Sequence, residues 1–308
     1  MRAAAAILAA FLLAACQDTE VPPARRPSFD PARVGRPNIA LVLGGGGPRG
    51  FAHVGVIKVL EEAGIVPDLI VGASVGSMVG ALQAGGMRAK QLEHEALELD
   101  VKRFFELRML GGGRSSGGMT QEWVHERVQG RSIEALQTPL VVTALRVRDG
   151  QLVLFNRGDT GLAVRASSAT PDMFEPVRIG DETYQDGDDA SPVPIRVARK
   201  LGARVVIAVD VSAFPETTPA SAPREWIDKD ARRARLVALE APEADVLLHP
   251  DIGYYAGHNV EYRRRVIALA EAYARAQLPA IRAALARAGV ALLQNESTER
   301  APAGVASR

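Results

Sequence analysis

Two glycine-rich segments, about 25 residues apart, carry the groups that could do chemistry in this chain. Residues 44–50 (GGGGPRG) follow the apolar run 39–43, and residues 72–76 (GASVG) follow the apolar run 69–71. A turn of the first kind presents main-chain N–H groups to a developing oxyanion, and one of the second kind presents a serine hydroxyl on a strained elbow. Together the two segments indicate an acyl-transfer hydrolase.

Ser74 is the candidate nucleophile. In the pattern Gly72-x-Ser74-x-Gly76 the glycines let the backbone turn sharply from strand to helix, so that the hydroxyl stays exposed. The N–H groups that follow begin a helix, whose positive end favours nearby negative charge. A serine at such a place can also be a helix N-cap. The position between apolar residues 69–71 and the helical pattern of residues 75–82 favours the nucleophile.

The glycine loop has two possible interpretations. Gly45-x-Gly47-x-x-Gly50 matches the fingerprint of dinucleotide-binding proteins, which would make the chain an oxidoreductase or a nucleotide-binding module. That fingerprint needs an acidic residue at the end of the second strand, where this chain has Gly-Ala-Ser. We therefore favour an oxyanion hole. Because Pro48 has no N–H, we assign the hole to the amides of Gly46 and Gly47.

A serine nucleophile needs a base that accepts its proton. Asp186 is the favoured candidate, because it ends an extended segment and precedes Gly187, where the chain must turn closely. An aspartate in such a place is also common in simple turns. His249 and His258 are the alternatives, since only these histidines follow Ser74 late enough for a Ser–Asp–His order.

Strand and helix patterns alternate from residue 38 onward, which predicts βαβ units and a largely parallel sheet. The expected strands are residues 39–43, 69–71, 140–147, 151–155, 204–211 and 245–248, and the expected helices are residues 51–62, 75–82, 88–99, 194–201 and 228–240, with a long helical region after them. Turn pairs at Asp149-Gly150 and Gly180-Asp181 predict two hairpins, the second of which ends in Asp186.

Composition sets the broad class of the protein. The chain has 308 residues, of which 47% are hydrophobic and 24% charged, so it can bury the core of a globular α/β domain. The net charge of +1, without a basic stripe, gives no reason to expect a nucleic-acid partner.

The N-terminus predicts export. Residues 1–15 read as a signal peptide whose apolar stretch is too short to span a bilayer. Cys16, the sole cysteine, follows Leu-Ala-Ala, which resembles the processing box of bacterial lipoproteins, where the thiol is acylated. The alternative is an unrelated cysteine in an ordinary signal or a buried helix. Gln17 in place of aspartate implies, by the same resemblance, the outer membrane facing the periplasm, so we expect a lipid-anchored protein of the bacterial cell envelope.

The expected domain order follows from this N-terminus. Residues 16–37 contain five prolines and predict an extended tether, and the folded catalytic domain is expected over residues 38–293. The polar residues 294–308 predict a disordered tail.

Four motifs in order give the chain a resemblance to bacterial patatin-like phospholipases. They are residues 44–50 with Ala-His-Val-Gly at 52–55, residues 72–76, residues 165–171 (RASSATP), and Asp186-Gly187. The resemblance covers residues 38–212 and continues only in outline to about residue 289. It implies a three-layer α/β/α fold and a dyad of Ser74 and Asp186 in place of a triad. It also implies hydrolysis of lipid acyl esters, of phospholipid or lysophospholipid, without metal or cofactor.

Two residues near these motifs leave their roles open. The family usually has Gly or Ala where this chain has Asp188. A carboxylate there either raises the pKa of Asp186 toward the operating pH or points to solvent. Arg49 in the glycine loop either holds the loop or binds a phosphate of the substrate.

Residues 101–118 combine basic with large apolar side chains and contain two glycine clusters. We hypothesise a mobile flap at the lipid interface. The alternative is a helix packed on the core with a loose loop after it. Two rival functions also stay open: an esterase with a histidine triad, and a lipoprotein that binds lipid without catalysis.

Overall fold

The computed structural model describes residues 22, 25–100, 113–171 and 173–291. Cys16, the signal peptide, most of the expected flap and the C-terminal tail lie outside the described residues. Within the described ranges, no helix is both long enough and apolar enough to cross a bilayer.

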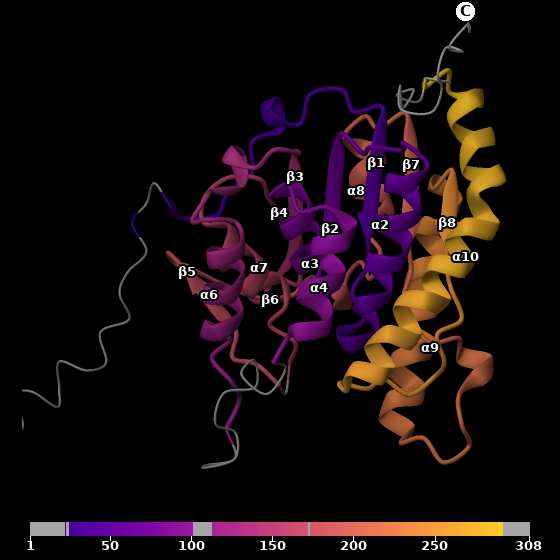
Figure 1. The fold of residues 1–308 in the computed structure, drawn as a ribbon. Coiled ribbons are helices and arrows are strands. Elements are labelled where there is room, and N and C mark those ends of the chain that lie inside the picture. The colour runs from indigo at the N-terminus through magenta and orange to yellow at the C-terminus, as the bar shows by residue number, and fades with distance from the viewer. Residues whose placement is uncertain (1–21, 23–24, 101–112, 172, 292–308) are drawn as a thin grey trace, which may run out of the picture.

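An eight-stranded mixed sheet forms the middle layer (Figure 1). Its strands are β1 (Ile39–Leu43), β2 (Leu69–Ala73), β3 (Leu140–Arg146), β4 (Leu152–Phe155), β5 (Val177–Ile179), β6 (Glu182–Asp186), β7 (Val205–Val209) and β8 (Val246–Leu248). The order is β5-β6-β3-β2-β1-β7-β8, with β4 also pairing β3. The pairs among β1, β2, β3, β7 and β8 are parallel, whereas β4, β5 and β6 pair antiparallel. This confirms the prediction of a mostly parallel sheet.

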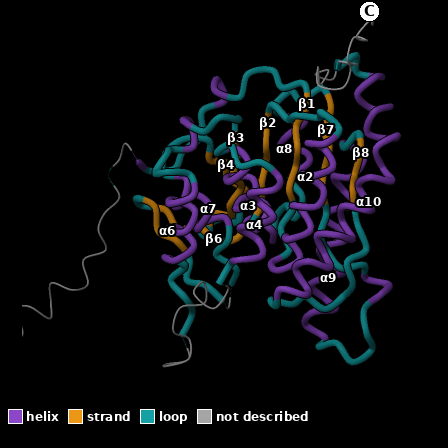
Figure 2. The backbone as a smooth tube through the Cα atoms, in the orientation of Figure 1, coloured by secondary structure: helices purple, strands orange, loops and turns teal. Residues whose placement is uncertain are grey.

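Helices cover both faces of the sheet, as the three-layer prediction requires. They are α2 (Ala52–Glu62), α3 (Val75–Ala84), α4 (Ala89–Glu98), α6 (Gly118–Arg127), α7 (Thr160–Ser167), α8 (Ile195–Lys200), α9 (Arg224–Glu240) and α10 (Val260–Arg287). Figure 2 shows α2, α3, α4 and α10 in front of the strands and α8 behind them. The predicted three-layer α/β/α architecture is therefore confirmed.

The central strands are apolar throughout because each of their faces is covered by a helical layer. In β1, Leu41 and Leu43 pack in the larger core with α2 and α10, while Ala40 and Val42 pack in the smaller core with α8. Both cores exclude water from the sheet, so the strand ends that carry the loops are held rigidly.

Helix α7 was not among the predicted elements. Asp159 is its N-cap and accepts a hydrogen bond from the Leu162 amide at 2.8 Å. The helix has only eight residues and contains Gly161, so its apolar period is weak in the sequence. Helix α9 also begins at Arg224, ahead of the predicted residue 228.

The expected tether of residues 16–37 is wrong in its described part, because residues 25–37 pack against the domain. Arg25 forms an ion pair with Asp159 at 2.8 Å, and the Asp30 amide donates to the Asn156 side chain at 2.8 Å. Val34 is buried in the smaller core. The prolines remove donors and periodicity from this segment, but its remaining main-chain groups still pair with the loop after β4. The folded part therefore begins near Arg25, ahead of Asn38.

Candidate active site

The two glycine-rich turns meet at the carboxyl ends of β1 and β2, which are neighbouring parallel strands. Loops at this edge of a parallel sheet usually form the ligand site of an open α/β fold. The turn after β2 has an unusual backbone, with Ser74 at φ 51° and ψ −127°. A positive φ in a residue with a side chain stores strain, which is typical of a nucleophile elbow.

Close backbone contacts explain why glycine flanks Ser74 on both sides. A Cβ on Gly76 would lie 2.0 Å from the carbonyl oxygen of Leu43, the last residue of β1. A Cβ on Gly72 would lie 2.5 Å from the Cα of Ser77. The lack of a side chain at Gly76 therefore lets the elbow approach the end of β1, and its lack at Gly72 lets the chain fold back on the start of α3.

Ser74 and Asp186, which are 112 residues apart, form a buried hydrogen bond. The Ser74 hydroxyl donates to Oδ2 of Asp186 at 2.7 Å. Their exposed fractions are 6% and 3%. Asp186 is the last residue of β6, at the end of the second predicted hairpin. The structure thus brings together the two residues that the sequence analysis assigned to the dyad.

Residues 165–171, which form the end of α7 and the turn after it, hold both members of this pair, and the sequence analysis gave them no individual role. The Ser167 hydroxyl accepts from the Ser74 amide at 2.9 Å. The Thr170 hydroxyl donates to the same Asp186 oxygen at 2.7 Å, and the Asp186 amide donates to the Ala169 carbonyl. A cluster of three hydroxyl residues in the RASSATP motif was the only signal of these positioning contacts.

The environment of Asp186 suits a base that works near neutral pH. Burial, and after it the nearby carboxylate of Asp188, raise the pKa of Asp186 from 3.8 to about 7. Hydrogen bonds from the Asp188 amide, Ser74 and Thr170 oppose this rise in pKa. A group with such a pKa can take a proton from the serine and return it to a leaving group.

Asp188 does not point to solvent, because Arg233 of α9 binds its carboxylate. The Arg233 side chain also donates to the Gly45 carbonyl at 2.6 Å and to the Ser212 hydroxyl at 2.5 Å. Arg233 is only 7% exposed. The sequence analysis missed this residue. Its signal is the spacing of Arg233, Val237 and Glu240, which places two charged residues on the buried face of a helix.

The four glycine amides at residues 44–47 differ in whether they donate a hydrogen bond to the protein. The Gly44 and Gly45 amides donate to Val209 and Pro192 carbonyls at 3.0 and 2.9 Å. The amides of Gly46 and Gly47 make no hydrogen bond within the described part of the chain, and both residues line the pocket. This geometry fits the predicted oxyanion hole, whose role stays a prediction.

Arg49 and His53 each form a hydrogen bond that helps to hold the glycine loop. Arg49 donates to the Tyr254 carbonyl at 2.6 Å, which ties the loop to the segment before α10. His53 lies under the loop with Nε2 2.8 Å from the Gly44 carbonyl. Burial lowers the pKa of His53 to about 4, so the ring is neutral near pH 7 and donates through Nε2.

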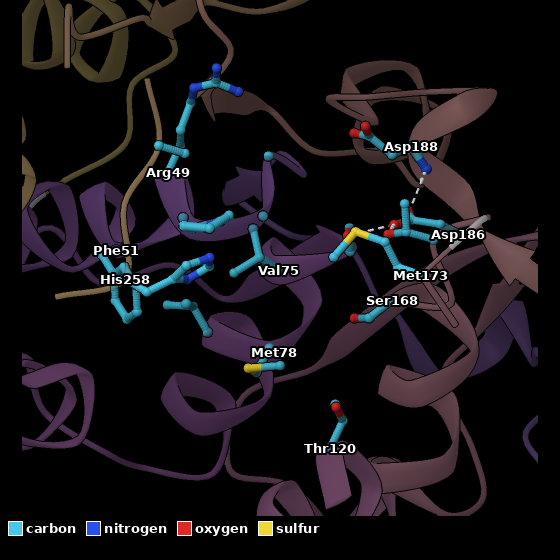
Figure 3. Close-up of a pocket in the computed structure, with 18 of the residues that line it drawn as sticks. Arg49, Phe51, Val75, Met78, Thr120, Ser168, Met173, Asp186, Asp188 and His258 are labelled. Carbon is cyan, nitrogen blue, oxygen red and sulfur yellow. Dashed lines mark hydrogen bonds between the residues drawn. The ribbon is translucent and has the colours of Figure 1, made fainter. Parts of the chain in front are cut away.

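Neither of the alternative bases, His249 and His258, accepts the hydrogen bond that the Ser74 hydroxyl donates. His249 stacks on Phe214 with ring centroids 3.9 Å apart, and its Nε2 lies 3.1 Å from the Ser212 carbonyl. His258 lines the same pocket but lies on the opposite side of it from Asp186 (Figure 3). The hydroxyl of Ser74 is therefore paired with a carboxylate, as the dyad prediction requires.

A pocket of about 550 Å³ opens beside this pair and has a polar end and a long apolar wall. The polar end contains Ser74, Asp186 and the glycine loop. The apolar wall is formed mainly by side chains of α3, α4 and α6, among them Met78, Val79, Leu82, Leu92, Ala96 and Trp123. Figure 3 shows Val75 and Met78 between the two sides of the pocket. A ligand with one ester group and a hydrocarbon chain would fit both ends.

Comparison with known proteins assigns the family. The model of the patatin-like phospholipase family matches residues 41–199, so the chain belongs to this family. It is 32% identical over 206 residues to an uncharacterized NTE family protein of Mycobacterium tuberculosis, covering 64% of this chain and 56% of that protein. It is 34% identical over 193 residues to human patatin-like phospholipase domain-containing protein 6, covering 58% of this chain and 14% of that one.

A solved structure shares the fold. VipD from Legionella pneumophila superposes with a TM-score of 0.54 at 14% identity, covering 87% of this chain and 72% of that one. The chain spans about half the length of its mycobacterial relative and a much smaller part of the human one. The matched residues 41–199 include Ser74 and Asp186 but not Arg233.

Proposed function

We propose that this protein hydrolyses acyl esters of lipids, with Ser74 as nucleophile and Asp186 as base. The observation that carries the proposal is the buried hydrogen bond of 2.7 Å between them, at the polar end of an apolar pocket. Ser74 has the strained backbone of a nucleophile elbow, and Asp186 has a pKa of about 7. A serine that served only as a helix cap would need neither feature.

The proposed reaction has two steps. Asp186 takes the hydroxyl proton as Ser74 attacks the ester carbonyl, and the amides of Gly46 and Gly47 stabilise the oxyanion. The protonated Asp186 then gives its proton to the leaving alcohol. A water molecule next attacks the acyl-serine, with Asp186 again accepting the proton, and the fatty acid leaves as Ser74 is reprotonated.

The substrate class we propose is phospholipid or lysophospholipid. The apolar wall of the pocket supports an acyl chain at this site. A relative from Mycosarcoma maydis, 31% identical over 194 residues, is named lysophospholipase NTE1, and this chain covers 10% of it. That name describes the relative and makes lysophospholipids the first substrates to test.

We also propose that the mature protein is anchored by lipid on Cys16, in the outer membrane facing the periplasm. The Leu-Ala-Ala-Cys sequence and Gln17 support this. Wild type expressed in a Gram-negative host should incorporate labelled palmitate and fractionate with outer membranes, whereas Cys16→Ala should do neither. Soluble, unlabelled wild type would exclude the anchor without affecting the catalytic proposal.

The catalytic proposal is tested with purified protein and a panel of lipid esters. Wild type should release fatty acid and be labelled by an alkyl fluorophosphonate at Ser74. Ser74→Ala should lose labelling, and its turnover should fall by at least about 10³-fold. Full esterase activity in folded Ser74→Ala would exclude this nucleophile. A folded wild type that binds lipid but is neither active nor labelled would favour the lipid-binding alternative.

A further inference from the structure

Helix α9 reaches the candidate active site from outside the residues that the family model matches. Its buried Arg233 makes three contacts there. The guanidinium donates to the Gly45 carbonyl, to the Asp188 carboxylate and to the Ser212 hydroxyl. One side chain therefore touches the glycine loop, the residue beside the base, and the segment after β7.

The contact with Gly45 controls the direction of a proposed oxyanion donor. The Gly45 carbonyl and the Gly46 N–H belong to one planar peptide group, in which they point in opposite directions. Because neither residue has a Cβ, rotation of this peptide meets little steric resistance. Arg233 binds the carbonyl oxygen at 2.6 Å and so holds the Gly46 N–H pointing away from α9. A rotated peptide would put a carbonyl where the donor is needed.

The contact with Asp188 controls the base. The Asp188 amide donates to Oδ1 of Asp186 at 2.9 Å, so the position of Asp188 affects that of Asp186. The Asp188 side chain is 16% exposed, and Arg233 supplies its opposite charge. Without that charge, two carboxylates only two residues apart would repel each other, and ionisation of Asp186 would cost more free energy.

Other charged groups lie near Arg233 and Asp188. Asp210, after β7, faces Arg233, and the ring of His53 beside them is neutral. Asp189 is paired with Arg232 on the outer side of α9. Arg49, Lys229 and Asp230 also line the pocket.

We propose that Arg233 is a positioning residue: it orients the Gly45–Gly46 peptide of the oxyanion hole and, through its ion pair with Asp188, favours the ionised form of Asp186. Asp188 and Arg233 act as one unit, which explains why this chain tolerates a carboxylate next to the base. The inference rests on the proposed hydrolase function.

The experiment separates geometry from charge with two substitutions at one position. Arg233→Gln removes the charge and weakens the contact with Gly45. We expect kcat on a soluble ester to fall by about 10²-fold, as for loss of one oxyanion donor, with KM nearly unchanged. The acid limb of kcat/KM should move to higher pH. Arg233→Lys keeps the charge without the guanidinium fork, so the acid limb should stay near the wild-type pH while kcat stays low.

The neighbouring Arg232 supplies the matched control. It is half exposed on the same helix and pairs with Asp189, so Arg232→Gln should leave both kcat and the pH profile unchanged. Asp188→Asn should move the acid limb to lower pH. In the double variant Arg233→Gln with Asp188→Asn, the acid limb should lie below that of Arg233→Gln alone, while kcat stays low.

Two results would overturn the inference. One is a folded Arg233→Gln variant with the kcat and acid limb of wild type. The other is a folded Arg233→Gln variant in which only KM changes. If the Arg233 variants do not fold, the pH profile of Asp188→Asn tests the proposal instead. An acid limb at the wild-type pH in that variant would contradict the proposal. Should wild type be inactive and unlabelled, the hydrolase proposal fails first. A carboxyl ¹³C titration of Asp186 in wild type and Arg233→Gln then tests the charge effect, and equal pKa values would exclude it.

Discussion

Residues 41–199 and residues 200–291 contribute to the same site in different ways. The first region supplies the proposed reacting groups. Ser74 stands on a turn with a strained backbone, and Gly76 in that turn is packed too closely for a side chain. The second region supplies α9, whose contacts with the site come from Arg233, an ordinary helical residue. A residue that needs an unusual backbone conformation is marked in the sequence by a local glycine motif. A supporting residue on a helix is marked only by its spacing from other buried residues of that helix.

The largest effect in the first region is expected at the base. Asp186→Asn should lower turnover to the level of Ser74→Ala, because an amide accepts no proton from the serine. The variant should fold, since the amide fills the same volume. Turnover assays beside circular dichroism check this, and a folded variant with more than about a tenth of wild-type activity would contradict the assignment.

The same substitution has a stability signature. The folded pKa of Asp186, about 7, lies above its ordinary value of 3.8, so ionisation destabilises the native state as pH rises between these values. Asp186→Asn removes this penalty. The melting temperature of the variant minus that of wild type should increase between about pH 4 and about pH 7 and then level off, by about 2–4 °C for each kcal/mol. A difference that stays constant with pH would show that the carboxyl is not perturbed.

The pH profile of the wild type is the next test. A base with a pKa of about 7 must be ionised to act, so kcat/KM should fall about tenfold per pH unit below that value. Measurement on a soluble ester avoids effects of the lipid surface. An acid limb near pH 4 would mean that neither burial nor Asp188 perturbs Asp186 in solution.

A smaller effect is expected at the loop that supports the dyad. Thr170→Val removes the hydroxyl that donates to Asp186 at 2.7 Å while keeping the shape of the side chain. The acid limb should move slightly upward, and kcat should fall by about tenfold, which corresponds to about 1.4 kcal/mol. Thr160→Val in α7, whose hydroxyl donates to the Arg131 carbonyl away from the dyad, should leave the pH profile unchanged.

The smallest effect on catalysis is expected at the far end of α9. Glu240 accepts from the Ser191 hydroxyl at 2.7 Å and from the Arg196 amide at 2.9 Å. Glu240→Gln should lower the free energy of unfolding by about 1–3 kcal/mol, with little change in kcat or in the acid limb. Denaturant unfolding and assays measure both. A catalytic loss as large as that of Arg233→Gln would show that α9 acts only as a scaffold, which would weaken the contrast between these positions.

Much of the fold was predictable because local patterns determined it. The bounds of β1 were predicted without error, since a strand buried on both faces is a continuous apolar run between turn residues. The hairpin that ends in Asp186 followed from its turn pair. The boundary of the domain at Asn38 was wrong, because proline-rich segments have no period that distinguishes a free tether from one packed on a domain.

The sequence by itself determined which residues carry the proposed chemistry. Ser74, Asp186 and the glycine loop are marked by glycines that no other residue can replace in such tight turns, and that requirement is local. Only the tertiary structure decided what surrounds them. The pairing of Asp188 with Arg233 joins residues 45 positions apart through side chains in different layers. Burial and charge at Asp186 depend on that assembly, because a pKa is set by every group packed around the carboxyl and not by its neighbours in sequence.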